Sequence, residues 1–296
     1  MPVTDTVSII IPAKNEAASL KMLLPELQKN FAYAEIIVVN DGSTDETSDI
    51  CKEYAVKEIC HPYSKGNGAA VKTGARAATG DVLVFMDGDG QHPIKEIACL
   101  LKKIQAGYDM VVGARQGMIS QANITRGLGN RFYNRLASWM VGHKVEDLTS
   151  GFRAVRADKF REFSHLYPNG FSYPTTSTMA FFRAGYSVCY HPIVALQREG
   201  KSHVNLIRDG VRFLLIIFKI GALYSPLKIF TPISVFIFML GLSYYTYTFV
   251  MFNRFTNMSA LLFTTSVIVF LMGLVSEQIT ALSYSGLSRT EKSKTS

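Results

Sequence analysis

The stretch that decides the fold is Asp81-Val-Leu-Val-Phe-Met-Asp87-Gly-Asp89-Gly-Gln91-His92-Pro93. Its first half is an apolar run typical of a buried strand, and its second half is a glycine-rich turn with two carboxylates one residue apart. Carboxylates at the carboxyl end of a strand suit a hard divalent cation that bridges to phosphate oxygens. Such a cation could hold a nucleotide diphosphate and stabilise it as a leaving group.

Two simpler interpretations of this turn compete with a phosphate site. A calcium-binding EF-hand loop needs glycine at its sixth position, where this chain has His92, and a helix in front, where this chain has a strand pattern. That interpretation fits poorly. Asp and Gly are also ordinary turn formers, so a structural turn without a ligand stays open on this motif alone.

Short apolar strands alternate with amphipathic helices over the first 120 residues. We expect strands at 7–13, 35–41, 58–61, 81–87 and 109–115, and helices at 16–30, 44–54, 66–79 and 94–105. Further on we expect helices at 124–140 and 173–184, a loop at 147–153 that enters a strand, and a last strand at 187–197. This order predicts an α/β fold, a mostly parallel sheet covered on both faces with ligands at the carboxyl ends of its strands.

Three strand ends carry polar groups that could meet in one crevice. They are Pro12-Ala-Lys14-Asn15-Glu16, Asn40-Asp41-Gly-Ser43, and the turn with Asp87 and Asp89. Asp41 is placed to accept hydrogen bonds from a base or a ribose. A helix-capping role for Ser43 or Thr44 explains the second motif without any ligand, and this alternative stays open.

The carboxyl-terminal third contains two long uncharged runs. No charged residue occurs at 229–253 or at 255–276. At about 1.5 Å per helical residue, each run exceeds the ~30 Å hydrocarbon thickness of a bilayer. We therefore expect two membrane-spanning helices joined by a turn at 253–257, in preference to two buried helices of a soluble protein.

The distribution of charge predicts how the two apolar runs are oriented in the membrane and which kind of partner the basic residues meet. Residues 206–296 hold eight Lys and Arg against three acidic residues, within a chain of net charge +8. Because these cations flank the apolar runs while the connecting turn has only Arg254, the positive-inside rule places both ends in the cytoplasm. The balance favours anionic lipid over nucleic acid. The first residues lack a basic region leading into an apolar segment, so no cleaved signal peptide is expected.

The remaining features of the sequence are the segment that connects its two halves and its four cysteines. Arg208, Arg212 and Lys219 fall on one narrow stripe of an otherwise apolar helix at 206–224, which suits a helix in the membrane interface; a core helix with surface cations is the alternative. Cys51, Cys60, Cys99 and Cys189 show no Cys-x-x-Cys spacing. This predicts a reduced compartment and no structural zinc.

Five motifs together resemble the polyprenyl-phosphate glycosyltransferases of glycosyltransferase family 2. They are Pro12-x-x-Asn15-Glu16, Val39-Asn-Asp41-Gly-Ser, Asp87-x-Asp89-x-Gln91-His92-Pro93, Gly113-Ala-Arg115 and Asp147-Leu-Thr-Ser-Gly-Phe-Arg153. The resemblance covers about residues 5–228. It implies a GT-A fold for the catalytic domain, which we place at 1–205. From the charge and hydropathy patterns we expect an interfacial helix at 206–226, two transmembrane helices at 227–284 and a cytoplasmic tail at 285–296.

The resemblance also implies an activity and a set of site residues. The activity is inverting transfer of a hexose from a UDP- or GDP-sugar to a membrane polyprenyl phosphate. The nucleotide sugar would be bound by Pro12, Lys14, Asn15, Glu16, Asp41, Asp87, Arg198 and Lys201. Mg²⁺ or Mn²⁺ would be held by Asp87, Asp89 and Gln91. The acceptor phosphate would meet Arg115, Arg126, Asn130 and Arg131, and Asp89, Arg115 and Arg126 would carry catalysis.

Two departures from the family pattern leave assignments open. The family usually has Ser four residues after the second acceptor arginine, whereas this chain has Asn130 after Arg126, and Arg131 competes for the role. The family also runs Arg, then Gly-x-Ser-Lys, whereas this chain has His203 at the Lys position and Lys201 two residues earlier. Either residue could meet the diphosphate, and a plain loop role for His203 is a further alternative.

Other functions remain to be weighed against transfer to a lipid phosphate. A polysaccharide synthase would carry a Gln-x-x-Arg-Trp motif, but the only tryptophan here is Trp139, in Ser-Trp-Met. A transferase acting on a neutral lipid hydroxyl would need a carboxylate base, which Glu146 or Asp147 could supply. A non-catalytic membrane adaptor with a nucleotide-sugar fold would be free to lose Asp87, Asp89 and Arg115. Self-association into a homo-oligomer is possible, with Gly241 and Ser243 as small residues that could face a partner helix.

Overall fold

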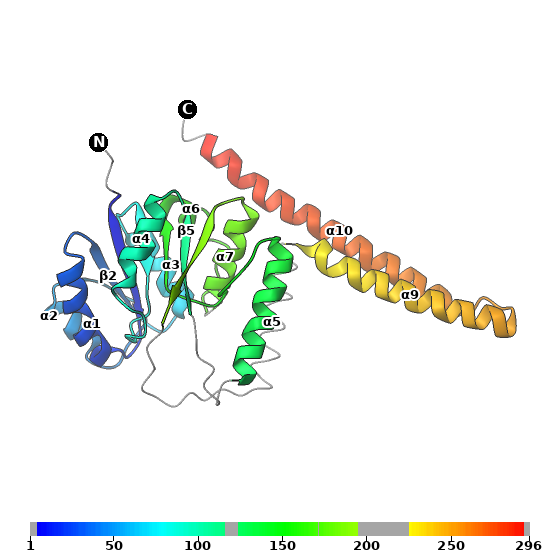
Figure 1. Cartoon of the computed structure of the whole chain (residues 1–296), viewed down its shortest axis with the longest axis horizontal. Helices are drawn as coiled ribbons and strands as arrows, with labels where there is room; N and C mark the ends of the chain where they lie inside the picture. Colours follow the sequence, from blue (N-terminus) through cyan, green and yellow to red (C-terminus); the bar gives the residue numbers. More distant parts are fainter. Residues whose placement is uncertain (1–4, 116–123, 171, 195–224, 293–296) are drawn as a thin grey trace. The chain divides into compact units, whose positions relative to one another are not determined.

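The computed structural model describes residues 5–115, 124–170, 172–194 and 225–292, without the side chains of 124–130 and 283–292. The chain divides into two compact units, one over 1–139 and 143–203 and the other over 140–142 and 204–296. Figure 1 shows an α/β unit and a helical hairpin. Most of the predicted interfacial helix at 206–226 lies outside the described residues, so the finer domain division stays a prediction.

One seven-stranded sheet forms the centre of the first unit. Its strands are β1 (Val7–Ala13), β2 (Glu35–Asn40), β3 (Lys57–Cys60), β4 (Val82–Phe85), β5 (Met110–Arg115), β6 (Arg153–Arg156) and β7 (Val188–Ile193), in the order β3-β2-β1-β4-β6-β5-β7. All pairings are parallel except those of β6 with β4 and β5. The predicted mostly parallel sheet is thus confirmed.

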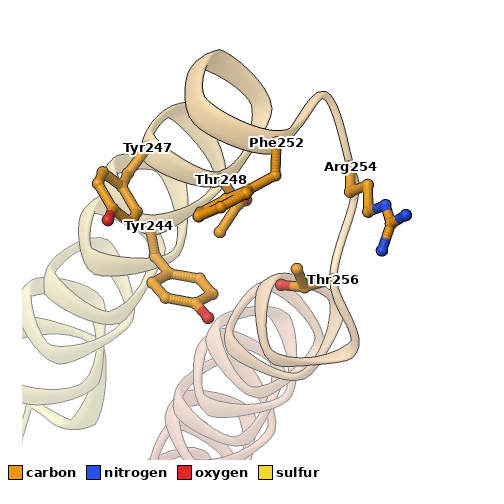
Figure 2. Close-up of a pocket in the computed structure, with 6 residues that line it drawn as sticks. All are labelled: Tyr244, Tyr247, Thr248, Phe252, Arg254 and Thr256. Atoms are coloured by element: carbon orange, nitrogen blue, oxygen red, sulfur yellow. The ribbon is translucent and has the colours of Figure 1, made fainter.

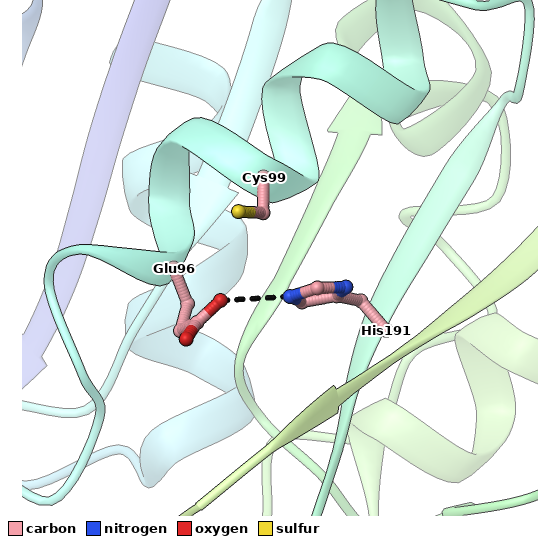
Figure 3. A group of neighbouring side chains, drawn as sticks. All are labelled: Glu96, Cys99 and His191. Atoms are coloured by element: carbon pink, nitrogen blue, oxygen red, sulfur yellow. Dashed lines mark hydrogen bonds and ion pairs between the residues drawn. The ribbon is translucent and has the colours of Figure 1, made fainter.

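Helices cover both faces of this sheet. They are α1 (Ala17–Asn30), α2 (Thr47–Glu53), α3 (Asn67–Ala77), α4 (Glu96–Gln105), α6 (Ala157–Glu162) and α7 (Tyr173–Arg183). A further helix, α5 (Ile124–Val141), follows β5 along the chain. Because strand side chains alternate, Ile9 and Ile11 join the core under α1 and α4, while Ile10 faces Gly74 of α3. Helix α4 lies beside β7, where Glu96 contacts His191 at 2.7 Å (Figure 3).

Strand β6 is the element that assembles the site. It runs antiparallel between β4 and β5, so its first residue, Arg153, pairs with Phe85 near the end of β4 and with Val112 in β5. The loop before β6 therefore arrives at the carboxyl ends of both parallel strands. The sequence pattern predicted a strand after this loop but neither its antiparallel direction nor the short helix α6 that follows it.

The second unit contains two long apolar helices, α9 (Pro226–Phe252) and α10 (Asn257–Lys292). The stretches 226–252 and 257–282 are long and apolar enough to cross a membrane, and only 11% and 17% of their most apolar windows are buried. Core helices of a soluble protein would be mostly buried. Asn253 ends α9 in the left-handed conformation (φ 47°), and Tyr244, Tyr247, Phe252 and Arg254 surround the turn (Figure 2). Aromatic rings and a cation are typical of a membrane–water interface.

Small residues at seven-residue spacing form the seam of this hairpin. Beyond Pro226 at the start of α9, the buried positions of the described side chains are Ser234, Gly241 and Thr248 on α9 and Ser259, Ser266, Gly273 and Thr280 on α10. A seven-residue repeat keeps one face of each helix against the other, and small side chains let the backbones approach closely. A Cβ on Gly241 would lie 3.0 Å from Leu262 Cβ. Gly241 therefore serves the hairpin itself, and the predicted role in self-association has no support from this residue.

Gly68 provides a test of the packing of α3. Alanine normally stabilises a helix relative to glycine, but a Cβ here would lie 2.1 Å from Pro168 O and 2.7 Å from Gly170 O. We expect Gly68→Ala to lower the free energy of unfolding by roughly 1–3 kcal/mol, because backbone atoms must move. Thermal or denaturant unfolding of the purified protein measures this change. Gly170→Ala is the matched control, since no heavy atom lies within 4 Å of its added Cβ; equal stability of the two variants would contradict the packing.

Candidate active site

Two carboxylates follow β4 at the centre of the sheet. Asp87 and Asp89 are half-buried, and Asp89 Oδ1 accepts a hydrogen bond from the backbone N–H of Gln91 at 3.1 Å. The Asp87 side chain is 35% exposed. A Cβ added to Gly151 would lie 3.3 Å from Asp87 Oδ2, so the loop before β6 passes close to this carboxylate and a larger residue would press on it.

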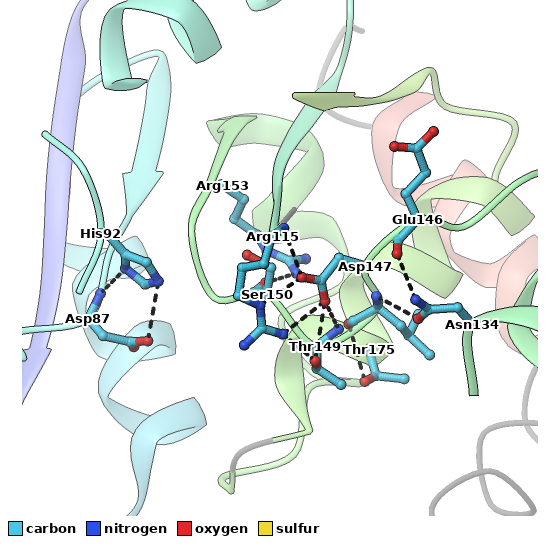
Figure 4. A network of polar contacts seen from close by, with 11 residues as sticks. Asp87, His92, Arg115, Asn134, Glu146, Asp147, Thr149, Ser150, Arg153 and Thr175 are labelled. Carbon is cyan, nitrogen blue, oxygen red and sulfur yellow. Dashed lines mark hydrogen bonds and ion pairs between the residues drawn. The ribbon is translucent and has the colours of Figure 1, made fainter. Parts of the chain in front are cut away.

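His92 stabilises the turn that carries Asp87 and Asp89. Its Nδ1 accepts a hydrogen bond from the backbone N–H of Asp87 at 3.0 Å, and its ring stacks on Phe152 with centroids 5.0 Å apart. Burial lowers the pKa of His92, while Asp87 and Asp89 raise it and Arg115 lowers it again. Gly151 lies beside Asp87, and Asp147 of the same loop bonds Arg115, so the acidic turn and Arg115 border one site (Figure 4).

Arg115, the last residue of β5, is held by Asp147 through two hydrogen bonds. Nε donates to Asp147 Oδ2 at 2.8 Å and Nη2 to Oδ1 at 3.0 Å, and Nη2 also donates to Thr149 Oγ1 at 2.6 Å. These bonds raise the pKa of Arg115. Burial favours a higher pKa for Asp147, but Arg115 outweighs it and holds the pKa below its usual value. The Arg115 side chain is 43% exposed and its Nη1 has no hydrogen-bond partner among the described residues, so it can meet an anion.

A buried arginine fixes the loop before β6. Arg153 is fully buried without a carboxylate partner among the described residues, and its guanidinium donates to Pro174 O, Ser177 Oγ and Thr178 Oγ1 at the start of α7 and to Ser150 O. Tyr173 OH donates to Gly151 O at 3.3 Å. Arg153 and Tyr173 therefore tie the loop at 147–151 to α7, which keeps Asp147 in place for Arg115.

Asp41, at the end of β2, is buried and fully engaged. Its oxygens accept from His61 Nδ1 at 2.7 Å, Ser64 Oγ at 2.8 Å, and the backbone N–H groups of Lys65 and Gly66 at 2.8 and 2.9 Å. Burial acts to raise the pKa of Asp41, but these four donors outweigh it and lower the pKa to about 2. A carboxylate offers about four acceptor positions, so a base or ribose would have to displace one of these donors.

The motif after β1 has both a framework part and an exposed part. Asn15 adopts a positive φ of 56°, its N–H donates to Ser43 Oγ at 2.9 Å, and its Oδ1 accepts from Thr44 N at 2.8 Å. Asn15 thus joins the loops that follow β1 and β2. Lys14 is exposed, while Glu16 and Pro12 are partly buried. Of the four, Lys14 is the residue best placed to reach a negatively charged ligand.

The donor set of the acidic turn fits a hard divalent cation. Asp87 and Asp89 offer carboxylate oxygens and Gln91 an amide oxygen, all from half-buried side chains on one turn. Mg²⁺ and Mn²⁺ prefer oxygen ligands of this kind and keep positions for substrate phosphates. Gln91 bonds Asp89 through its backbone, which leaves its side-chain oxygen available.

Several predicted residues lie beyond what the structure describes. The side chains of Arg126 and Asn130, on α5, and the whole of Arg198, Lys201 and His203 are in this group. Arg131 is described and exposed on α5. The choice between Arg126 and Arg131, and that between Lys201 and His203, stay predictions.

The structure adds residues that the sequence motifs did not assign to the site. His92 and Arg153 stand inside quoted motifs, but their roles depend on contacts with Phe152 and α7 that no motif reveals. Thr149 also belongs to a quoted motif. His61 has no motif, although β3 pairs with β2 so that Cys60 lies beside Asn40, which places His61 next to Asp41.

Comparison with known families and proteins gives two family matches. The model of glycosyl transferase family 2 matches residues 8–164, which is more than half of the chain. The model of the GtrB C-terminal hairpin matches residues 225–282. The second match coincides with α9 and the apolar part of α10, and together with their exposed apolar surface it indicates a membrane protein.

Individual relatives and a solved structure agree with these matches. Polyprenol monophosphomannose synthase of Mycolicibacterium smegmatis is 29% identical over 66% of this chain and 79% of the relative. Dolichol-phosphate mannosyltransferase of Pyrococcus furiosus is 35% identical over 56% of this chain and 50% of the relative. Glucosyl-3-phosphoglycerate synthase of Mycobacterium tuberculosis, solved with Mn²⁺, UDP and glucosyl-3-phosphoglycerate, has a TM-score of 0.56 at 20% identity over 74% of this chain and 79% of that one. This last likeness shows the GT-A fold.

The low pKa of Asp41 makes stability depend on pH. A carboxylate whose pKa falls from 3.8 to about 2 on folding stabilises the fold above pH 3.8, and this contribution is lost as the pH falls through 2. We expect Asp41→Asn to cost on the order of 2 kcal/mol of unfolding free energy at pH 7, with a deficit that shrinks between pH 4 and pH 2. Unfolding followed across this range measures it. Asp49→Asn, in an exposed pair with Lys52, is the control and should change little; a deficit that is the same at pH 7 and pH 2 would refute the assignment.

Proposed function

The chain belongs to glycosyl transferase family 2, and we propose that it transfers a hexose from a nucleotide sugar to the phosphate of a membrane polyprenyl phosphate. The product would be a polyprenyl-phosphate monosaccharide with inverted anomeric configuration. Relatives named for polyprenol-phosphate and dolichol-phosphate mannosyl transfer support this acceptor class. The names of these relatives favour mannose as the sugar to test first.

The observation that carries the proposal is the position of Arg115 beside the acidic turn. Asp87 and Asp89 follow β4, Arg115 ends β5, and β6 with its preceding loop lies between these strands. Carboxylates and an exposed guanidinium at the carboxyl ends of β4 and β5 suit a reaction in which a diphosphate leaves and a phosphate attacks. The carboxylates would act through a cation and the guanidinium directly.

No general base is required for this reaction. A phosphate monoester is already ionised at neutral pH, whereas a sugar or lipid hydroxyl must lose a proton as it attacks. Asp147, one of the two candidate bases, is bound to Arg115 through both oxygens, and the other, Glu146, pairs with Lys144 at 2.9 Å. This favours a phosphate acceptor over a neutral lipid hydroxyl.

The bond changes balance without a proton transfer. A phosphate oxygen of the acceptor attacks the anomeric carbon, the bond from that carbon to the nucleotide diphosphate breaks, and the diphosphate leaves with the bonding electrons. A single displacement of this kind inverts the anomeric centre. Arg115, positioned by Asp147 and Thr149, would hold the attacking phosphate in line, so that orientation supplies much of the rate enhancement.

Asp87, Asp89 and Gln91 would hold Mg²⁺ or Mn²⁺. When bound, the ion would neutralise charge on the departing diphosphate. The structure of the distant synthase that was solved with Mn²⁺ and UDP is consistent with this choice of ion. Lys14 is exposed in the loop after β1, and its ammonium group would contact the nucleotide phosphates from this loop. Arg198 and Lys201 remain further candidates.

The hairpin would keep the enzyme at its lipid substrate. A polyprenyl phosphate has its charged head at the bilayer surface, so a catalytic unit tethered to the membrane meets it at high local concentration. We propose that the catalytic unit and both chain ends lie in the cytoplasm, because basic residues flank the apolar runs. A non-catalytic adaptor would also need the tether, and the assay below separates the two.

The experiment is transfer by the purified full-length protein in detergent. Polyprenyl phosphate, Mg²⁺ or Mn²⁺ and a panel of labelled UDP- and GDP-hexoses are supplied, and lipid-linked product is measured. We expect product with polyprenyl phosphate and none with polyprenol or diacylglycerol, inverted configuration by NMR, and loss of turnover with EDTA or in Asp89→Asn. Product on a neutral lipid, or full activity of Asp89→Asn, would overturn the acceptor class or the metal assignment respectively.

Arg115 gives a sharper test of the acceptor site. Arg115→Lys keeps the charge but loses the two-fold contact with Asp147, so we expect kcat/KM for polyprenyl phosphate to fall roughly 10–100-fold, the value of one or two charged hydrogen bonds. The affinity for the nucleotide sugar, measured by calorimetry without acceptor, should change little. Asp147→Asn should give a smaller loss in the same direction. A defect confined to donor binding would contradict the assignment.

A further inference from the structure

We propose that Glu96, Cys99 and His191 form a second metal site, separate from the acidic turn, that binds a zinc-class transition metal. The three residues lie between α4 and β7 in the catalytic unit. None of them belongs to the site described above. The cysteine spacing in the sequence predicts no structural zinc, and this inference departs from that expectation because the ligands come from distant parts of the chain.

The geometry brings one ligand atom from each residue together. The carboxylate oxygen, the thiol sulfur and the imidazole nitrogen all lie within 4.8 Å of one another. Glu96 and Cys99 are one helical turn apart on α4, so both face the same strand. Glu96 Oε2 lies 2.7 Å from His191 Nε2, and Figure 3 shows the Cys99 thiol on the same side of the helix as this pair.

The donor types select the metal. Oxygen, sulfur and nitrogen from Glu, Cys and His are the ligands of Zn²⁺ in proteins, and three protein ligands leave a fourth position for water. Mg²⁺ and Mn²⁺ prefer oxygen alone, so they would stay with Asp87, Asp89 and Gln91. The two sites therefore differ in chemistry as well as in place.

An ordinary ion pair between Glu96 and His191 accounts for two of the three residues but not for the thiol beside them. A second cysteine on the same interface gives a comparison. Cys189 lies two residues before His191, and Lys103, one more turn along α4 from Cys99, donates to Cys189 Sγ at 3.5 Å and to Tyr190 O at 2.8 Å. A cation thus occupies the neighbourhood of Cys189, whereas Cys99 faces a carboxylate and an imidazole.

A metal at this point would fasten two elements that border the active site. Helix α4 follows the turn with Asp87 and Asp89, and β7 pairs with β5 so that Ile193 lies beside Arg115. All three ligands are partly exposed, which leaves a path for the ion. Binding to the folded state alone would raise the unfolding temperature.

The test is metal binding by the full-length protein in detergent, with thiols kept reduced. Co²⁺ and Zn²⁺ are added to metal-free protein, and the thiolate-to-Co²⁺ absorption band and the shift in unfolding temperature are recorded. We expect one equivalent to bind at this site with the band present, whereas an ion on Asp87, Asp89 and Gln91 has oxygen ligands alone and gives no such band. Cys99→Ser and His191→Gln should abolish the band and weaken Zn²⁺ binding by more than about 100-fold, since loss of an outer-shell partner already costs 10–100-fold.

Cys189→Ser is the matched control, because it removes a thiol from the same interface without touching the proposed ligands. It should keep both the band and the temperature shift. Where a Cys99 or His191 variant is unstable, Glu96→Gln, which retains Cys99 and His191, should still show weaker binding and a smaller temperature shift. The proposal is overturned if the wild-type protein gives no thiolate-to-Co²⁺ band, or if the band survives in Cys99→Ser.

Discussion

The two-fold hydrogen bond between Arg115 and Asp147 is the interaction on which the candidate site depends. A guanidinium at the end of β5 can meet a ligand reproducibly only if its side chain is held, and Asp147 holds it through both oxygens. Asp147 is in turn fixed because Arg153, buried under the same loop, bonds the start of α7. The antiparallel strand β6 makes this chain of contacts possible, since it delivers the loop to the ends of β4 and β5.

Local pattern predicted most elements of the catalytic unit. The run before Asp87 is apolar on both faces, as a central parallel strand requires, and β1 begins and ends where the sequence indicates. The direction of β6 could not be predicted, because it depends on which strands flank it and not on its own four residues. The partners of Asp41 could not be predicted either, because His61, Ser64 and the N–H groups of 65 and 66 follow β3 and reach Asp41 only through the pairing of β3 with β2. The role of Asp41 toward a ligand stays a prediction.

The two helices of the hairpin pair for a different physical reason from the strands of the sheet. In a bilayer, apolar surface gains little from meeting another apolar surface, so close backbone approach decides which helix faces pair. Ser234 donates to Ser266 O at 2.8 Å, while Gly241 lies against Leu262 and Phe263 and Gly273 lies against Phe230. Many Leu, Ile and Phe side chains of both helices point outward. The sequence revealed the length and apolar character of both helices. It did not reveal which residues of the other helix each small residue receives, because that depends on how the two helices face each other.

The central claim is that Asp87 and Asp89 bind a divalent ion next to the Arg115 guanidinium, which binds the acceptor phosphate. Anomalous diffraction from crystals grown with Mn²⁺ and a nucleoside diphosphate tests it most directly. The account predicts a manganese peak within bonding distance of the carboxylates of Asp87 and Asp89, with the diphosphate on the same ion and Arg115 still on Asp147. A bound nucleotide whose manganese lies away from both carboxylates would contradict it.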